Sequence, residues 1–184
     1  FTKYEAKAMF FSEEKCIAVG MPRNDIFFKN DSSIKDKVYE FCGIKKDTKL
    51  ILFAPTYRVD VSDYTKSKQQ SVIDINYKKV IEALENKFSG KWRFAIRLHP
   101  KLKDIVLDDN SVINLTDYPD MQEILYASNI VITDYSSLMW DFALSKKPCL
   151  LYAPDIAEYE LKRGFYMPYP SINFSTVYPK SILH

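Results

Sequence analysis

The chain has 184 residues, a length that suits one α/β domain with a complete hydrophobic core. Apolar residues make up 47% of it and charged residues 27%, as in ordinary globular proteins, and the formal net charge is only +2. That balance argues against nucleic-acid binding, which needs a broad basic face, and no apolar run reaches the roughly eighteen residues of a membrane-spanning helix.

Residues 1–15 begin without a secretion signal and are expected to form an arm or linker from a missing amino-terminal domain. The apolar run CIAVG, residues 16–20, predicts the first strand of a domain that extends over residues 16–166. A helix over residues 32–44 is expected to begin at a serine pair suited to capping and to end at a glycine. The next apolar run, residues 50–56, predicts a buried strand.

The segment 57–74 is polar, lacks a regular period and is long for a connection between a strand and a helix. Loops of this kind are often functional, and Lys66 and Lys68 beside Tyr64 indicate that it closes over a ligand or contacts anionic lipid headgroups. A solvated loop without a binding role is the alternative.

Strands and helices alternate through the rest of the chain, which predicts right-handed crossovers and a parallel sheet. The expected fold class is therefore α/β, a Rossmann-like domain of three layers. Residues 167–184 hold prolines among aromatic residues and are expected to form an extended tail. The further strands are expected over residues 92–100, 112–115, 129–134 and 148–154, and the further helices over 76–88, 119–128, 137–147 and 155–163.

Four of the expected strands end in cationic, carboxylate or hydroxyl residues. The carboxyl ends of parallel strands lie at one edge of the sheet, and open parallel sheets bind their ligands there. Because arginines, a histidine and hydroxyls collect at this edge, the sequence predicts a phosphate-binding site. The residues are Arg23 after the first strand, Thr56 and Arg58 after the second, Arg97 and His99 after the third, and Asp134, Ser136 and Ser137 after the fifth.

Ser136 and Ser137 stand where the strand over 129–134 gives way to a helix. The N–H groups at a helix amino terminus carry partial positive charge, and the two hydroxyls would add donors for a phosphate oxygen. Capping of the helix by Ser136 is the alternative interpretation. Asp141, inside that helix, is expected to orient a hydroxyl donor, to contact a polyol, or to be a solvated charge.

Arg58 and His99 are the other candidate ligands of the phosphate. The planar guanidinium of Arg58 suits bidentate binding, with a surface salt bridge as the alternative. Arg97 and His99 are two residues apart, so their side chains are expected on one face. His99 would then donate to a pyrophosphate or stabilise charge on a leaving phosphate, with a purely structural histidine as the alternative.

Several motifs are absent, and their absence narrows the function. The chain has no G-x-G-x-x-G, no G-x-x-x-x-G-K-[ST] and no G-x-S-x-G, so dinucleotide binding, a P-loop and a hydrolase elbow have little support. The three cysteines are scattered in apolar stretches and are expected to be reduced core residues of a cytoplasmic protein. No metal site and no cofactor are expected. The cysteines are Cys16, Cys42 and Cys149.

The chain resembles the carboxyl-terminal half of the CDP-glycerol glycerophosphotransferase family, the teichoic-acid primases and polymerases of Gram-positive bacteria and related capsule polymerases. The likeness follows the family's order from about residue 20 to residue 166, and the run of motifs is more specific than any one of them. The motifs are G-M-P-R-N-D (20–25), L-F-A-P-T-Y-R (52–58), R-L-H-P (97–100), T-D-Y-P-D-M-Q-E-I-L (116–125), I-T-D-Y-S-S-L-M-W-D-F-A (132–143), K-K-P-C-L-L-Y-A-P-D (146–155) and Y-E-L-K-R-G-F-Y (159–166).

The resemblance implies the donor-binding half of a GT-B architecture, which is two Rossmann-like domains that face a cleft. The implied reaction transfers polyol phosphate, foremost glycerol phosphate, from a CDP-linked donor to a hydroxyl of a lipid-linked acceptor and releases CMP. It implies a peripheral enzyme on the cytoplasmic face of the membrane, poorly active without its amino-terminal domain, which binds the acceptor. The implied catalytic residue is His99, and the implied donor-binding residues are Arg58, Thr56, Arg97, Ser136, Ser137, Asp134, Asp141 and Arg23.

The tail departs from the family pattern. Where the family continues through an acidic stretch and a Pro-Gly-Pro turn, this chain reads MPYPSINFSTVYPK, so a different polyol such as ribitol remains open. Two other functions also remain open. One is the donor half of another GT-B glycosyltransferase that uses a nucleotide sugar, and the other is a non-catalytic nucleotide-binding module.

Overall fold

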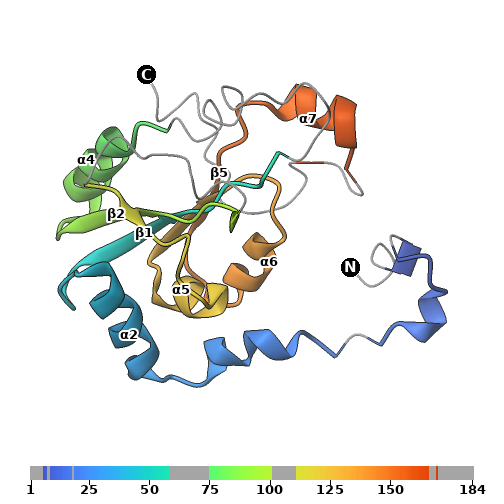
Figure 1. Cartoon of the computed structure of the whole chain (residues 1–184), viewed down its shortest axis with the longest axis horizontal. Helices are drawn as coiled ribbons and strands as arrows, with labels where there is room; N and C mark the ends of the chain where they lie inside the picture. The colour runs from blue at the N-terminus through green and yellow to red at the C-terminus, as the bar shows by residue number, and fades with distance from the viewer. Residues whose placement is uncertain are drawn as a thin grey trace.

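A computed structural model of the chain describes residues 6–7, 9–17, 19–58, 75–100, 111–165 and 169. Its centre is a five-stranded sheet in the order β3-β2-β1-β4-β5, and all four neighbouring pairs are parallel. The expected Rossmann-like α/β fold is thereby confirmed (Figure 1). The strands are β1 Lys49–Phe53, β2 Trp92–Ile96, β3 Ile113–Asn114, β4 Ile130–Thr133 and β5 Cys149–Leu151.

The strand order changes direction beside β1. The chain leaves β1 for β2 and then β3 on one side, and later returns to β4 and β5 on the other side. In the register, Phe53 of β1 pairs with Ile96 of β2 and with Ile132 of β4. The carboxyl ends of β1 and β4 therefore flank the point where the connections diverge, which is where open α/β sheets bind ligands.

Helices cover both faces of the sheet, so the three layers are also confirmed. Figure 1 shows α4 on one face and α2, α5 and α6 on the other, while α7 follows β5. A helix between two parallel strands runs antiparallel to them, so α4, α5 and α6 each begin near the carboxyl edge of the sheet. The helices are α2 Ser32–Cys42, α4 Tyr77–Phe88, α5 Met121–Ala127, α6 Leu138–Ala143 and α7 Ile156–Arg163.

The core consists of two apolar clusters, one on each face of the sheet. Strand β1 serves both: Leu50 and Leu52 face the cluster under α2, α5 and α6, and Ile51 and Phe53 face the cluster under α4. All four side chains are fully buried. This is why β1 reads as a continuous apolar run with no polar alternation.

The helix ends follow from local chemistry. Asp31, and not the serine pair after it, caps α2, because its carboxylate accepts from the backbone N–H of Ser33 at 2.9 Å. Gly43 ends the helix as expected, with a φ of 62° that favours glycine. Asp120 caps α5 in the same way and accepts from the backbone N–H of Gln122 at 2.7 Å.

The expected strand over residues 16–20 is wrong. Its described residues form no strand, and Ile17 and Val19 are 80% and 82% exposed. A strand persists only when a neighbour completes its ladder, and the described sheet has β3 and β5 at its two edges. The segment instead joins two 3-10 helices, η1 Glu13–Lys15 and η2 Pro22–Phe28.

Two of the three cysteines belong to the core, and the third does not. Cys149 in β5 is buried as expected, and Cys42 packs against the core at the end of α2. Burial raises the pKa of the Cys42 thiol to about 11 and that of Cys149 to about 12. Cys16 is half-buried and lies outside both core clusters, contrary to the expectation.

The predicted loop over residues 57–74 is described only at Tyr57 and Arg58, and the predicted tail over 167–184 only at Tyr169. Lys66 and Lys68 lie outside the described residues. The domain boundaries at residues 15 and 166 remain predictions. Within the described ranges, no helix has the length and hydropathy to cross a bilayer.

Replacement of Leu52 by alanine should lower the free energy of unfolding by about 2–5 kcal/mol, because it opens a cavity in the central strand. Urea unfolding followed by circular dichroism measures the change. Leu161→Ala is the matched control, since Leu161 is 87% exposed on α7 and its loss should cost less than about 0.5 kcal/mol. Equal effects of the two substitutions would contradict the assigned core.

Candidate functional site

The loops after β1 and β4 are joined at the carboxyl edge of the sheet. Thr133 Oγ1 donates to the carbonyl oxygen of Ala54 at 2.7 Å, and the backbone N–H of Thr56 donates to Asp134 Oδ1 at 2.9 Å. Thr133 and Asp134 are both fully buried. The predicted site residues Thr56 and Asp134 are therefore in direct contact, although Thr56 contributes its backbone; its hydroxyl is buried and has no partner among the described residues.

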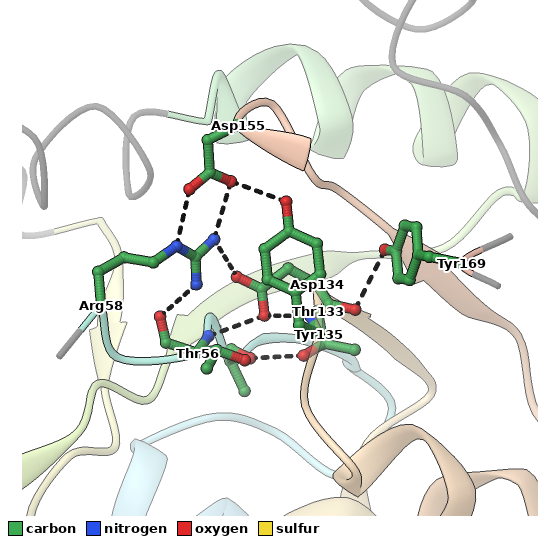
Figure 2. A network of polar contacts seen from close by, with 8 residues as sticks. Thr56, Arg58, Thr133, Asp134, Tyr135, Asp155 and Tyr169 are labelled. Atoms are coloured by element: carbon green, nitrogen blue, oxygen red, sulfur yellow. Dashed lines mark hydrogen bonds and ion pairs between the residues drawn. The ribbon is translucent and has the colours of Figure 1, made fainter. Parts of the chain in front are cut away.

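Arg58 lies at the centre of a buried ion-pair network (Figure 2). It donates from Nε and Nη2 to the two carboxylate oxygens of Asp155 at 2.8 and 3.0 Å. Its Nη2 is also 2.7 Å from Asp134 Oδ2, and its Nη1 donates to the carbonyl oxygen of Thr56 at 2.7 Å. Because Arg58 is only 4% exposed, the alternative of a surface salt bridge is wrong.

The charges of this network stabilise one another. Burial acts to lower the pKa of Arg58, but the carboxylates of Asp155 and Asp134 outweigh it and hold the pKa above its ordinary value. Burial likewise acts to raise the pKa of Asp155, yet Arg58 and the hydroxyl of Tyr135 hold it below the usual range. Arg58 and Asp155 are therefore both charged near neutral pH.

Tyr135 adds an aromatic side to the network. Its hydroxyl donates to Asp155 Oδ1 at 2.9 Å, and its ring lies 4.7 Å from the guanidinium carbon of Arg58. Tyr159 of α7 stacks on Tyr135 with 3.8 Å between ring centroids. Burial and the charge of Asp155 raise the pKa of Tyr135, so its hydroxyl remains a donor. We call Arg58, Asp134, Tyr135 and Asp155 the Arg58 cluster.

The serine pair begins α6, directly after the Arg58 cluster. Ser137 occupies the N-cap position, but its side chain makes no capping hydrogen bond and is exposed. Ser136 Oγ accepts from the backbone N–H of Leu138 at 3.3 Å. The side-chain cap of α6 therefore comes from Ser136, as the alternative interpretation expected, and Ser137 stays exposed.

A cavity of about 730 Å³ opens between η2 and α6. Ser137 and Arg23 line it together with Asp141, and Trp140 and Phe28 contribute apolar surface. It therefore combines a hydroxyl and a cation with aromatic walls. Such a mixture of apolar walls and a few polar groups is typical of sites for small molecules.

Asp141 is buried, so its interpretation as a solvated helix charge is wrong. Its carboxylate accepts from Asn24 Nδ2 at 2.6 Å, from Arg23 Nε at 3.0 Å and from Gln122 Nε2 at 3.0 Å. The side chain of Arg23 remains 50% exposed beside the cavity. Arg23 thus reaches the edge through η2 and not through the expected strand over 16–20.

His99 and Arg97 have different neighbours at the end of β2. His99 is exposed and stacks on Tyr57, with ring centroids 4.8 Å apart and an interplanar angle of 20°. Arg97 is half-buried, and its Nη1 is 3.4 Å from Met121 Sδ at the start of α5. Burial lowers the pKa of Arg97 somewhat, against the opposing charge of Asp120.

The structure therefore gathers the predicted residues along one edge in three groups. Arg58 follows β1, His99 follows β2 and Ser137 follows β4, and these three strands are adjacent and parallel. Their roles toward a ligand remain predictions. Among the described residues, no group of three or more histidine, cysteine or carboxylate side chains is arranged to hold a metal ion.

Four residues of the site were missed from the sequence: Asp155, Tyr135, Asn24 and Gln122. Asp155 follows β5, so the same rule of strand ends that indicated Arg58 also applies to it. Tyr135 lies between two predicted residues. No local signal indicates Asn24 or Gln122, because they meet Asp141 from 117 and 19 residues away in the chain.

The fold is a Rossmann-like domain whose candidate site lies at the carboxyl edge of its parallel sheet. The chain belongs to the CDP-glycerol:poly(glycerophosphate) glycerophosphotransferase family, whose model matches residues 2–182. The resemblance found in the sequence is thereby confirmed, and the family is one of transferases.

Two curated relatives and a solved structure illustrate the similarity. The chain is 37% identical over 172 residues to a teichoic acid poly(glycerol phosphate) polymerase of Bacillus spizizenii, covering 87% of the chain and 41% of the relative. It is 28% identical over 174 residues to the teichoic acid ribitol-phosphate polymerase TarL of Staphylococcus aureus, covering 91% and 30%. It also matches a structure of the wall teichoic acid polymerase TagF at 30% identity and a TM-score of 0.68, covering 91% and 40%. The chain thus spans less than half the length of each.

Asp155→Asn should make the protein less stable in a way that depends on pH. At pH 7 we expect a loss of about 2–4 kcal/mol in the free energy of unfolding, because Arg58 loses one of its two buried counter-charges. Since the pKa of Asp155 is lowered in the folded state, its contribution is present above the unfolded pKa of about 3.9 and is lost as the pH falls through the folded value.

Urea unfolding of both proteins at pH 7 and at pH 3 tests this expectation. The difference between them should shrink at pH 3, while other carboxylates titrate in both proteins and cancel. Asp36→Asn is the control, because Asp36 pairs with Lys46 at the surface and should contribute less than about 1 kcal/mol. A difference that is the same at both pH values would contradict the assignment.

Proposed function

We propose that the chain is the donor-binding domain of a CDP-polyol phosphotransferase. The observation that carries the proposal is that Arg58, His99 and Ser137, each from a different motif, follow adjacent parallel strands at one edge of the sheet, in a chain that belongs to this family over nearly its whole length. The reaction transfers glycerol phosphate from CDP-glycerol to a hydroxyl of a teichoic-acid or capsule acceptor.

In the proposed complex the donor occupies the cavity between η2 and α6, and its diphosphate lies at the Ser137 end. Ser137 offers an exposed hydroxyl, and the half-exposed Arg23 offers positive charge beside it. The apolar surface of Trp140 supports the nucleoside. Arg97 and His99 follow β2 at the same edge of the sheet, outside the lining of the cavity, and we propose that they bind phosphate oxygens from that side.

The chemistry follows from these positions. The acceptor oxygen attacks the phosphorus that bears glycerol, and the bond from that phosphorus to the bridging oxygen of the diphosphate breaks. CMP leaves with the electron pair of that bond, and the proton of the acceptor hydroxyl passes to a base outside this chain. His99 and Arg97 stabilise the charge on the departing CMP, and stabilisation of developing charge is the largest contribution in phosphoryl transfer.

The remaining features of the proposal concern parts beyond this chain. The acceptor is a lipid-linked polymer that binds to an amino-terminal domain, and the chain spans only 41% of its glycerol-phosphate relative. The complete enzyme acts as a peripheral protein at an anionic membrane surface, on its cytoplasmic face. The proposal includes no cofactor besides the CDP-linked donor.

Ser137→Ala and Arg97→Ala should each weaken the binding of CDP-glycerol by roughly tenfold or more, since each removes a hydrogen-bond donor from a charged ligand. Isothermal titration calorimetry measures the dissociation constants. Lys87→Ala is the control for Arg97→Ala, because it also removes one positive charge but lies at the end of α4, at the opposite edge of the sheet. No binding by the unaltered chain, or equal losses in all three variants, would refute the proposed site.

The choice of nucleotide and polyol is tested by competition. CDP should displace bound CDP-glycerol more strongly than UDP does, which separates this donor from the nucleotide sugars of other glycosyltransferases. CDP-glycerol should bind more tightly than CDP-ribitol, in line with the higher identity to the glycerol-phosphate polymerase than to the ribitol-phosphate polymerase. Tighter binding of CDP-ribitol would reassign the polyol and leave the site unchanged.

A further inference from the structure

The loop between β4 and α6 is held by the carboxylate of Asp134. Its Oδ1 accepts from the backbone N–H of Tyr135 at 2.6 Å and from that of Thr56 at 2.9 Å, so it fixes the loop to the end of β1. Its Oδ2 lies 2.7 Å from Arg58 Nη2. Because Asp134 is fully buried, its charge is tolerated only while Arg58 stays in place.

Arg58 is in turn oriented by Asp155. The two side chains form two nearly parallel N–H···O bonds of 2.8 and 3.0 Å, the geometry that restricts a guanidinium most strongly. Asp155 occupies the N-cap position of α7, after β5. The corner between β5 and α7 thus determines the position of a side chain that follows β1.

Tyr135 is held at both of its ends by the same cluster. Its backbone N–H donates to Asp134, and its hydroxyl donates to Asp155 Oδ1 at 2.9 Å. Its ring lies against Arg58 on one side and stacks on Tyr159. The residue directly before Ser136 therefore has little freedom to rotate, and Figure 2 shows its hydroxyl directed at Asp155.

The charges argue against direct binding of phosphate by Arg58. Its guanidinium is already paired with the carboxylates of Asp134 and Asp155. Arg58 is also only 4% exposed, whereas Ser137 in the following turn is exposed. Arg58 is thus placed to act on a ligand through the loop.

We propose that Asp155 is a positioning residue, which acts through Arg58 and Asp134 to fix the orientation of Ser136 and Ser137 at the start of α6. Only one part of this inference rests on the proposed function: that the two serines, held in a preformed arrangement, bind the donor phosphates. The positioning itself is a property of the protein without ligand.

Hydrogen exchange in the ligand-free chain tests the positioning. In Asp155→Asn, the backbone amides of residues 135–138 should exchange roughly tenfold faster or more, because opening of the loop no longer has to break the ion pair between Arg58 and Asp155. The exchange rates of the amides in β1 and β2 should change much less. Glu158→Gln is the matched control on the same helix, since Glu158 pairs with Lys162 at the surface and should leave the loop unchanged. Unchanged exchange of the loop in Asp155→Asn would overturn the inference.

Tyr135→Phe provides a milder variant should Asp155→Asn fail to fold. It keeps the ring against Arg58 and removes only the hydroxyl bond to Asp155, so a smaller increase in the same amides is expected. If Asp155→Asn does not fold and the folded Tyr135→Phe variant shows no increase in the exchange of these amides, Asp155 is needed only for stability. That result would refute the positioning role.

Binding of CDP-glycerol separates positioning from direct contact. If Arg58 bound phosphate itself, Asp155→Asn would release its donors toward the ligand, and affinity would stay the same or rise. Positioning predicts the opposite, a fall of roughly tenfold, with Ser137→Ala adding little in the double variant because both act on one contact. A chain that does not bind CDP-glycerol at all would refute the proposed function, while the exchange result would still decide the positioning.

Discussion

The buried pairing of Arg58 with Asp134 and Asp155 is the interaction on which the functional edge of this domain depends. A guanidinium that is 4% exposed is stable only beside compensating charge, and the two carboxylates come from the ends of two different strands. The loops after β1, β4 and β5 must therefore adopt mutually consistent conformations. Each loop taken alone would be free to move, but the shared ion pairs make them one unit.

This arrangement separates the residues that shape the edge from those that a ligand can reach. Arg58 and Asp134 are buried, and Asp155 completes the ion pairs from the loop after β5. Ser137 and His99 are exposed, and Arg23 is half-exposed. Preformed donors lose little freedom when they bind a ligand, so a buried support next to exposed donors suits a site that must hold a diphosphate in one orientation.

A second network performs the same task for α6. Asp141 is held by Arg23, Asn24 and Gln122, which connects the helix to η2 and to α5. One wall of the cavity is thereby fixed to the other. In the described part of the segment before η2, the apolar side chains of Ile17 and Val19 remain exposed.

Much of the fold was predictable from the sequence because it follows from local patterns. The buried runs gave strands β1, β2, β4 and β5, since strands covered on both faces are apolar throughout. The pattern was misleading at residues 16–20, because an apolar run indicates a strand only if a neighbouring strand completes its hydrogen bonds. The two ends of α2 differ in the same way. The end at Gly43 could be predicted because a positive φ favours glycine, whereas the sequence did not indicate that Asp31, and not the serines, caps the helix.

The sequence by itself determined which chemical groups stand at the carboxyl edge, because strand ends and helix starts are local features that each motif specifies. The tertiary structure alone decided which of these groups face one another. Arg58 meets Asp155 across 97 residues of chain, and Arg23 meets Asp141 across 118. The same arginine fork suits a phosphate or a carboxylate equally well, so only the packing of β1 between its neighbours, with the corner of β5 and α7 above it, assigned Arg58 to the carboxylates and left Ser137 exposed.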